Sequence, residues 1–273
     1  MVSDGRAVQR AIGARRCDAR GVPDDFDQLI REASGAPADS WDFGWLEGRA
    51  TEERPSWRYF DRVAERLEHA HRLLDLDTGT GNMLVDLPRL PPLTVATDAY
   101  EPSIEAAAQR LRSRGAQLVR TQGDRQALPF ADATFDLIIS RHPIETWWPE
   151  IARVLEPGGH YFSQQVGPHS LRELSELLMG PLPAGSKRDP ELARRAAEGA
   201  GLIVEDLQFE RNRVVFHDIG AVVYFLRVVV WTVPDFSVSR YRPQLLQLHN
   251  HIQATGAFET TSSRFLIDAR RPA

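Results

Sequence analysis

Cysteine, excess basic charge and long apolar runs are all scarce in this 273-residue chain. Cys17 is its one cysteine, which excludes an internal disulfide framework and a cysteine-based metal cluster. The net charge of -5 leaves no broad basic surface for nucleic acid. The most apolar run, residues 219–233, carries Arg227 and is shorter than the roughly 20 residues that span a bilayer. Residues 1–20 are polar and rich in arginine, unlike a signal peptide. We therefore expect a cytoplasmic protein without a membrane segment, and nucleic acid is disfavoured as a partner, although local basic patches stay open.

The most informative stretch, residues 73–82, is an apolar strand that leads into a glycine turn and a helix start. Gly79 and Gly81 allow unusual backbone torsions and the close approach of a ligand, and the helix start offers N–H groups to an anion. Asp98 ends the next apolar run, near the roughly 20-residue spacing at which an acid holds ribose hydroxyls. The two features together predict a nucleotide-like cofactor at the edge of an open α/β sheet.

What the turn lacks narrows the choice of cofactor. A dinucleotide fingerprint that starts at Gly79 needs a third glycine at position 84, where this chain has Leu84. NAD is therefore disfavoured. S-adenosylmethionine (SAM) has no pyrophosphate, so a glycine-lined turn and an acid for the ribose are sufficient for it.

Three more segments continue the pattern in order. Gly123 and Asp124 precede an Ala-Leu-Pro-Phe stretch, residues 135–140 form an apolar run, and residues 150–159 end in Pro-Gly-Gly. Together with the glycine turn, these segments resemble the class I, seven-strand SAM-dependent methyltransferases over residues 73–166. The resemblance implies an α/β fold with a doubly wound, mostly parallel seven-strand sheet and helices on both faces, and SAM as the cofactor.

The resemblance also implies a set of cofactor contacts. The acid of the segment after the third strand, Asp124 here, meets the adenine amine in that family. The residues that we expect around the cofactor are Asp75, Asp77, Thr78, Gly79, Gly81, Asp98, Ala99, Gly123, Asp124, Arg125, Ser140 and Arg141.

One residue departs from the family pattern, because Asp77 stands where the first glycine of the motif is usual. Its carboxylate is placed near the amino-acid end of the cofactor, where it can hold the amino group. Alternatively, it points away and caps the turn, since Asp accepts local N–H bonds. A third alternative is weakened or lost cofactor binding.

Apolar runs that alternate with helical segments predict βαβ units, preceded by an N-terminal helical arm and interrupted by a helical insertion before the last strand. We divide the chain into an arm and aromatic-rich cap (1–60), a SAM-binding core (61–210), an insertion or lid (211–256) and the last strand (257–273). The predicted helices are 25–33, 56–69, 102–114, 170–179, 190–199 and 238–254, and the last two strands are 203–209 and 265–269.

Two segments have alternative interpretations. The aromatic group that includes Trp45, Trp57 and Tyr59 either pins the arm onto the core or covers the cofactor or substrate pocket. The insertion is aromatic enough for a lid over an organic substrate, but it can also build a dimer contact or enlarge the core. A homodimer is therefore left open.

The residues after the fourth strand are the candidates for catalysis. His142 has an intrinsic pKa suited to proton transfer near neutrality, and Glu145 can orient it or bind a cationic acceptor. Alternatively, His142 and Glu145 are loop residues without a catalytic role, with His142 satisfied by hydrogen bonds within the loop. His217, His249 and His251 are weaker candidates, and we assign no metal because residues two apart do not share a helix face.

The leading hypothesis is a methyltransferase that modifies an O or N atom of a small-molecule acceptor. An RNA or protein methyltransferase is the enzymatic alternative, and a continuous basic groove would support it. The other class is a non-catalytic SAM-binding or partner module of the same fold, which Asp77 keeps open.

Overall fold

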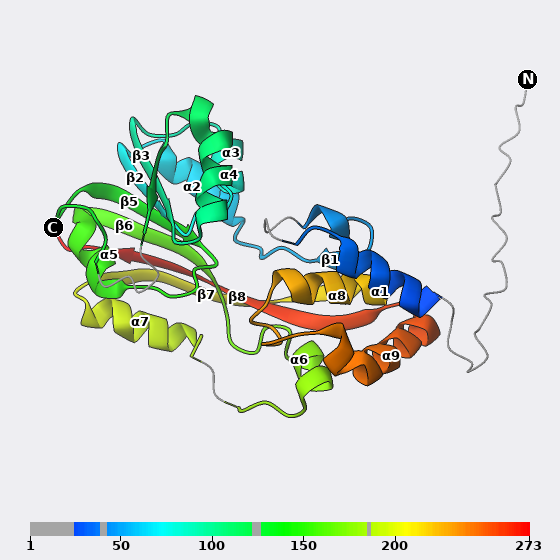
Figure 1. Cartoon of the computed structure of the whole chain (residues 1–273). Coiled ribbons are helices and arrows are strands. Elements are labelled where there is room, and N and C mark those ends of the chain that lie inside the picture. Colours follow the sequence, from blue (N-terminus) through cyan, green and yellow to red (C-terminus); the bar gives the residue numbers. More distant parts are fainter. Residues whose placement is uncertain (1–24, 39–42, 122–126, 185–186) are drawn as a thin grey trace, which may run out of the picture.

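A computed structural model describes residues 25–38, 43–121, 127–184 and 187–273 of the chain. Its strands form one eight-stranded sheet in the order β1-β7-β8-β6-β5-β2-β3-β4 (Figure 1). Helices cover both faces of the sheet, so the doubly wound α/β fold is confirmed. The sheet contains the seven predicted strands and one more, β1, at its edge.

The parallel half consists of β2 (Arg72–Leu76), β3 (Leu93–Asp98), β4 (Gln117–Arg120), β5 (Phe135–Arg141) and β6 (Leu155–Val166). These strands pair in parallel in the order β4-β3-β2-β5-β6. β2, at the centre, is buried over Leu73, Leu74 and Asp75. Its apolar run has no polar alternation because helices cover both of its faces.

The other half is antiparallel. β8 (Phe258–Arg270) pairs with β6 on one side and with β7 (Ile203–Phe216) on the other, and β1 (Ala50–Glu52) pairs with the far end of β7. β7 and β8 are longer than the predicted strands 203–209 and 265–269. Residues 211–216, which we expected in the insertion, continue β7, so the helical part of the insertion begins at Ile219.

Two apolar layers hold the helices against the sheet. On one face, α2 (Tyr59–Leu67), the short α3 (Asn82–Asp86) and α4 (Glu101–Leu111) pack on β2, β3 and β5. On the other face, α5 (Trp148–Val154) and α7 (Pro190–Gly199) pack on β5, β6 and β8. Proline explains why α3 has only five residues, because Pro88 prevents the helix from continuing.

A third core lies where β7 and β8 extend past the parallel strands, and we call its helices the helical unit. α1 (Asp25–Gly35), α6 (Arg172–Met179), α8 (Ile219–Val228) and α9 (Val238–Thr255) gather there (Figure 1). α8 is apolar except for Arg227 and almost entirely buried in this core. Arg227 donates to the carbonyls of Ala33 and Ala36 at the end of α1.

The ends of α8 and β1 are tied together by charge. Asp218 caps α8 by accepting the Ala221 N–H at 2.9 Å. The same carboxylate pairs through both oxygens with Arg49, just before β1, at 2.8 and 3.0 Å. The helical unit is thereby joined to the edge strand. No helix in the described part of the chain is long and apolar enough to cross a membrane.

A buried carboxylate links α2 to the sheet and allows a test of this packing. Asp268 of β8 accepts from Arg66 of α2 at 2.5 Å and contacts His160 of β6 at 2.9 Å. Burial alone would raise the pKa of Asp268, but the hydrogen bonds with His160 and Arg66 hold it below its usual value. The charged carboxylate therefore stabilises the fold above the unfolded-state pKa of about 4, and that contribution is lost as the pH falls further.

We expect Asp268→Asn to lower the free energy of unfolding by about 2 kcal/mol at pH 7. The difference from wild type should shrink below about pH 4, in urea titrations across the pH range. Asp206→Asn is the matched control, because Asp206 pairs with Arg62 of the same helix but its side chain is 29% exposed. Its effect should stay below about 1 kcal/mol. Equal effects of the two variants would contradict this account of the packing.

Candidate active site at the carboxyl edge of the sheet

Three neighbouring strands end at one level and bring the predicted residues together. Leu76 of β2 lies opposite Thr97 of β3 and Ser140 of β5, and the Thr78 N–H donates to the Thr97 carbonyl at 2.9 Å. The turn after β2, the Asp98-Ala99 pair after β3 and Arg141 at the end of β5 therefore lie along one edge.

The turn after β2 uses three residues with left-handed backbone. The φ angles are 59° at Asp77, 59° at Gly79 and 77° at Gly81. Asp tolerates this conformation better than most residues, which explains how it replaces a usual glycine. A Cβ on Gly81 would meet Leu111 at 3.0 Å, whereas a Cβ on Gly79 would meet nothing within 4 Å. Gly81 therefore serves packing against α4, and Gly79 faces open space.

Asp98 holds the turn in place. One carboxylate oxygen accepts the Gly79 N–H at 3.0 Å, and the other accepts the Tyr100 N–H at 2.8 Å. Ala99 lies between them on the loop after β3. Arg110 of α4 supports the next residues of the turn by donating to the Thr80 hydroxyl at 2.7 Å. These bonds within the protein hold the backbone of the edge in place.

Carboxylates crowd this edge. Burial raises the pKa of Asp75 to about 7; the Thr78 hydroxyl opposes this shift, and the negative charges of Asp77 and Asp98 add to it. Like charges and low dielectric both disfavour ionisation of Asp75. A cation that reached these carboxylates would relieve the repulsion.

Two buried tyrosines, neither of them a predicted cofactor contact, support the edge from below. Tyr161 of β6 shares a hydrogen bond of 2.7 Å with the Ser140 hydroxyl, which also meets Ser163 at 2.9 Å. The Tyr59 hydroxyl donates to the Ser140 carbonyl at 2.9 Å. Burial raises the pKa of both tyrosines, and carboxylates add to it: that of Asp75 for Tyr59 and that of Asp77 for Tyr161. The hydroxyl and carbonyl of Ser140 are therefore both used in hydrogen bonds to residues that pack within or against the sheet.

His142 follows β5 and its ring is oriented by a relay. The Trp57 indole N–H donates to the Gln164 amide oxygen at 2.8 Å, which directs the Gln164 amide nitrogen to His142 Nε2 at 3.0 Å. Because an indole has only a donor, Gln164 must donate to His142, and Nε2 must accept. The neutral ring then carries its proton on Nδ1.

The surroundings of His142 also keep it neutral. Burial lowers its pKa well below 6.5, and the charges of Arg264, Arg141 and Arg188 lower it further. With Nε2 occupied and the pKa depressed, the geometry favours His142 as a hydrogen-bond donor through Nδ1 over the expected proton acceptor. The backbone of His142 is also in the left-handed region, with a φ of 58°, which shows that the loop holds this residue in an unfavourable conformation.

The other sequence-predicted residues fall into three groups. Arg141 and Glu145 are exposed near this edge. Gly123, Asp124 and Arg125 lie outside the described residues. His249 is buried against Asp25 in the helical unit, 3.2 Å away, and His251 packs on Phe258, so neither reaches the edge. Within the described ranges, no three potential ligands gather to hold a metal.

The aromatic residues of the N-terminal region have two roles: one packs within the helical unit, and two support the edge of the sheet. Trp45 stacks on Tyr224, with ring centroids 4.9 Å apart, inside the helical unit. Trp57 and Tyr59 instead make the hydrogen bonds that position Gln164 and Ser140 at the edge. Trp45 therefore serves packing, whereas Trp57 and Tyr59 support residues of the candidate site.

Comparison with known proteins identifies the central segment. Residues 73–159 match a family described as a methyltransferase domain. Over 141 residues the chain is 30% identical to the demethylmenaquinone methyltransferase of Corynebacterium glutamicum, covering 48% of this chain and 59% of that protein. Over 110 residues it is 34% identical to the biotin biosynthesis bifunctional protein BioHC of Cellvibrio japonicus, covering 38% of this chain and 21% of that protein. The chain thus spans less than two thirds of these relatives.

Solved structures share the fold at low identity. The YcgJ protein of Bacillus subtilis aligns with a TM-score of 0.56 at 16% identity, over 80% of this chain and 99% of its own. The [4+2]-cyclase SpnF aligns with a TM-score of 0.51 at 18% identity, over 91% of this chain and 93% of its own. Residues 73–159 thus match a methyltransferase domain, and the chain shares the fold of these solved structures.

The relay to His142 can be tested by nitrogen NMR of the histidine rings. We expect His142 to stay neutral from about pH 6 to 8, with its proton on Nδ1. Trp57→Phe removes the N–H that orients Gln164, so the other tautomer should become populated. Trp45→Phe, in the helical unit, should leave the His142 signals unchanged. Titration of His142 between about pH 6 and 7 in the wild type would contradict this assignment.

Proposed function

We propose that this protein is a SAM-dependent methyltransferase that acts on an O or N atom of a small-molecule acceptor. The observation that carries the proposal is the edge at Gly79 and Asp98, where a turn with open space lies beside a crowded group of carboxylates. SAM is a sulfonium with an ammonium group and ribose hydroxyls, so it offers positive charge and hydrogen-bond donors to such a group.

The residues present fit the cofactor. Asp98 would hold the ribose hydroxyls, since each oxygen of a carboxylate can accept more than one hydrogen bond. Asp75 and Asp77 would face its positive charge, and Gly79 and Ala99 would line it with small side chains. Arg141, Asp124 and Arg125 stay predicted contacts. Ser140 would act through the sheet rather than by direct contact, because its hydroxyl meets Tyr161 and Ser163.

SAM, when bound, supplies the activated methyl group, and the protein has to place the acceptor in line with it. In our proposal, the Nδ1–H of His142 orients an acceptor oxygen or nitrogen. Glu145, exposed on the same loop, remains the candidate that would receive a proton. Arg141 and Arg264 would keep His142 neutral through their positive charge.

The preference for a small acceptor rests on charge. The net charge of -5 supplies no general attraction to RNA, the substrate of one alternative class. A non-catalytic module is the second candidate, because Asp77 alters the usual motif. The domain division, the cytoplasmic location and a homodimer stay predictions.

Titration calorimetry with SAM and a labelled-methyl assay over a panel of hydroxyl and amine acceptors test the proposal. Asp98→Ala should weaken SAM binding at least about tenfold, because it removes a carboxylate that meets the ribose and supports the turn. Asp132→Ala is the control, since Asp132 pairs with Arg153 away from the edge. SAM binding without transfer to any acceptor would favour the non-catalytic module. Absence of SAM binding would contradict both the methyltransferase and the SAM-binding module.

The raised pKa of Asp75 predicts that SAM binding is linked to proton release. At pH 7 about half of the Asp75 carboxyls carry a proton, and a bound cation would lower their pKa. Binding should therefore release protons near pH 7 and tighten as the pH rises from about 6 to 8. Calorimetry in buffers of different ionisation enthalpy measures the release, and Asp75→Asn should remove it. Equal proton release by wild type and variant would contradict this linkage.

A further inference from the structure

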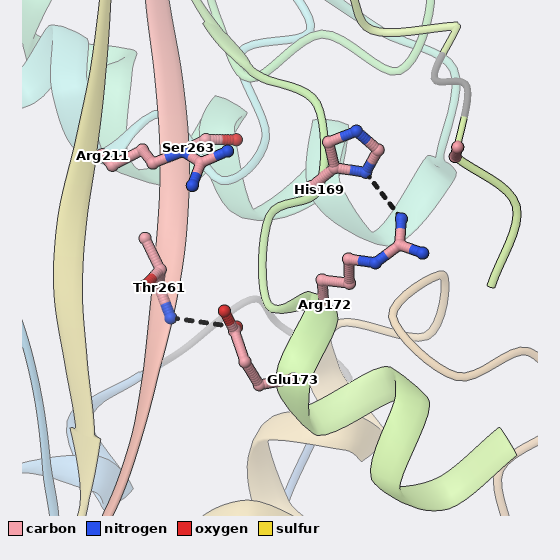
Figure 2. Close-up of a pocket in the computed structure, with 7 residues that line it drawn as sticks. His169, Arg172, Glu173, Arg211, Thr261 and Ser263 are labelled. Carbon is pink, nitrogen blue, oxygen red and sulfur yellow. Dashed lines mark hydrogen bonds between the residues drawn. The ribbon is translucent and has the colours of Figure 1, made fainter. Parts of the chain in front are cut away.

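A pocket of about 300 Å³ lies beside the outer part of β8, where Thr261 and Ser263 line it. It lies between α6, the loop near Ala184 and the outer part of the paired strands β7 and β8 (Figure 2). The residues that line it are His169, Arg172, Glu173, Ala184, Arg211, Thr261 and Ser263. None of them belongs to the predicted cofactor or catalytic set, and the volume is at the lower end of small-molecule sites.

Arg172 holds one wall of this pocket in shape. Its guanidinium donates to the carbonyls of Leu182 at 2.5 Å and Pro183 at 3.0 Å, and meets His169 Nδ1 at 2.9 Å. Because a guanidinium has only donors, Nδ1 must accept, and the neutral ring carries its proton on Nε2. In Figure 2 the ring nitrogen that does not meet Arg172 points away from it. His169 therefore retains one N–H donor.

Glu173 uses one of its two carboxylate oxygens in hydrogen bonds to β8. One of its oxygens accepts the Thr260 hydroxyl at 2.7 Å and the Thr261 N–H at 3.3 Å. Burial alone would raise the pKa of Glu173, but these bonds, a bond from its own backbone and the charge of Arg211 lower it. Its position in the first turn of α6 also places it at the positive end of the helix. Its negative charge is therefore stabilised in this position and partly offset by Arg211 and the helix end.

Arg211 supplies the cation of the pocket. It is exposed on β7, and Figure 2 shows its guanidinium extending past β8 toward the space beside His169. Within the described ranges its guanidinium forms no salt bridge, in contrast to Arg213 two residues along the same strand, which pairs with Glu259. The donors that line the pocket are thus the Arg211 guanidinium and the His169 imidazole N–H, and the second oxygen of Glu173 is an acceptor in the same lining.

We propose that this pocket binds the carboxylate or phosphate group of a small anionic ligand, held between the Arg211 guanidinium and the His169 Nε2–H. A guanidinium matches either oxyanion through two parallel hydrogen bonds, and the imidazole Nε2–H adds a further donor. None of the residues that line the pocket is among those proposed to bind SAM or the acceptor.

Titration of the whole protein with inorganic phosphate and, separately, with succinate tests this site. NMR of the histidine rings at constant ionic strength follows His169 Nε2, and calorimetry gives the affinity. We expect saturable binding of at least one probe with a dissociation constant of about 1 mM, and Arg211→Gln should weaken it about tenfold or more. The stronger of the two probes identifies the oxyanion.

Arg213→Gln is the matched control, because it removes the same charge from the same strand outside the pocket. It should leave probe affinity unchanged, and SAM affinity should be the same in Arg211→Gln as in wild type. Equal weakening by the two variants would mean general attraction of anions and would overturn the site. No saturable binding of either probe up to roughly 20 mM would overturn it as well.

Discussion

The parallel pairing of β2 with β3 and β5 is the constraint on which the rest of the structure depends. Because Leu76 lies opposite both Thr97 and Ser140, the residues that follow the three strands meet at one edge. Helices must cover both faces of such strands, which accounts for the two apolar layers. A slip of one residue in this register would turn Asp98 away from the Gly79 N–H and separate the turn from its support.

Charge of opposite sign is separated along this edge. Carboxylates gather after β2 and β3, where burial and mutual repulsion raise the pKa of Asp75. Guanidiniums gather toward β5 and β8, where Arg141 and Arg264 lower the pKa of His142. Ionisation of Asp75 is costly because like charges lie beside it, whereas Arg264 is paired with Glu52 at 2.6 Å. The carboxylates suit a cationic cofactor, and the guanidiniums keep a hydrogen-bond donor neutral at the place proposed for the acceptor.

The sequence predicted the elements that depend on local signals. Gly79, Asp98 and helix 190–199 were recognisable because turn glycines, an acid at the end of an apolar run and a proline at a helix start act over few residues. The Trp57–Gln164 bond joins residues far apart in the chain, and no local pattern encodes it. The length of β7 was missed for a related reason: its outer half is defined by pairing with β8 and β1, which only the folded chain brings together.

The central claim is that the edge formed by β2, β3 and β5 binds SAM. The most direct measurement is a crystal structure of the protein with S-adenosylhomocysteine, the product of methyl transfer. The account predicts the ribose hydroxyls within hydrogen-bond distance of Asp98, and the amino group near Asp75 and Asp77. The product bound elsewhere, or Asp77 filling the space beside Gly79 with no product bound at saturating concentration, would contradict it.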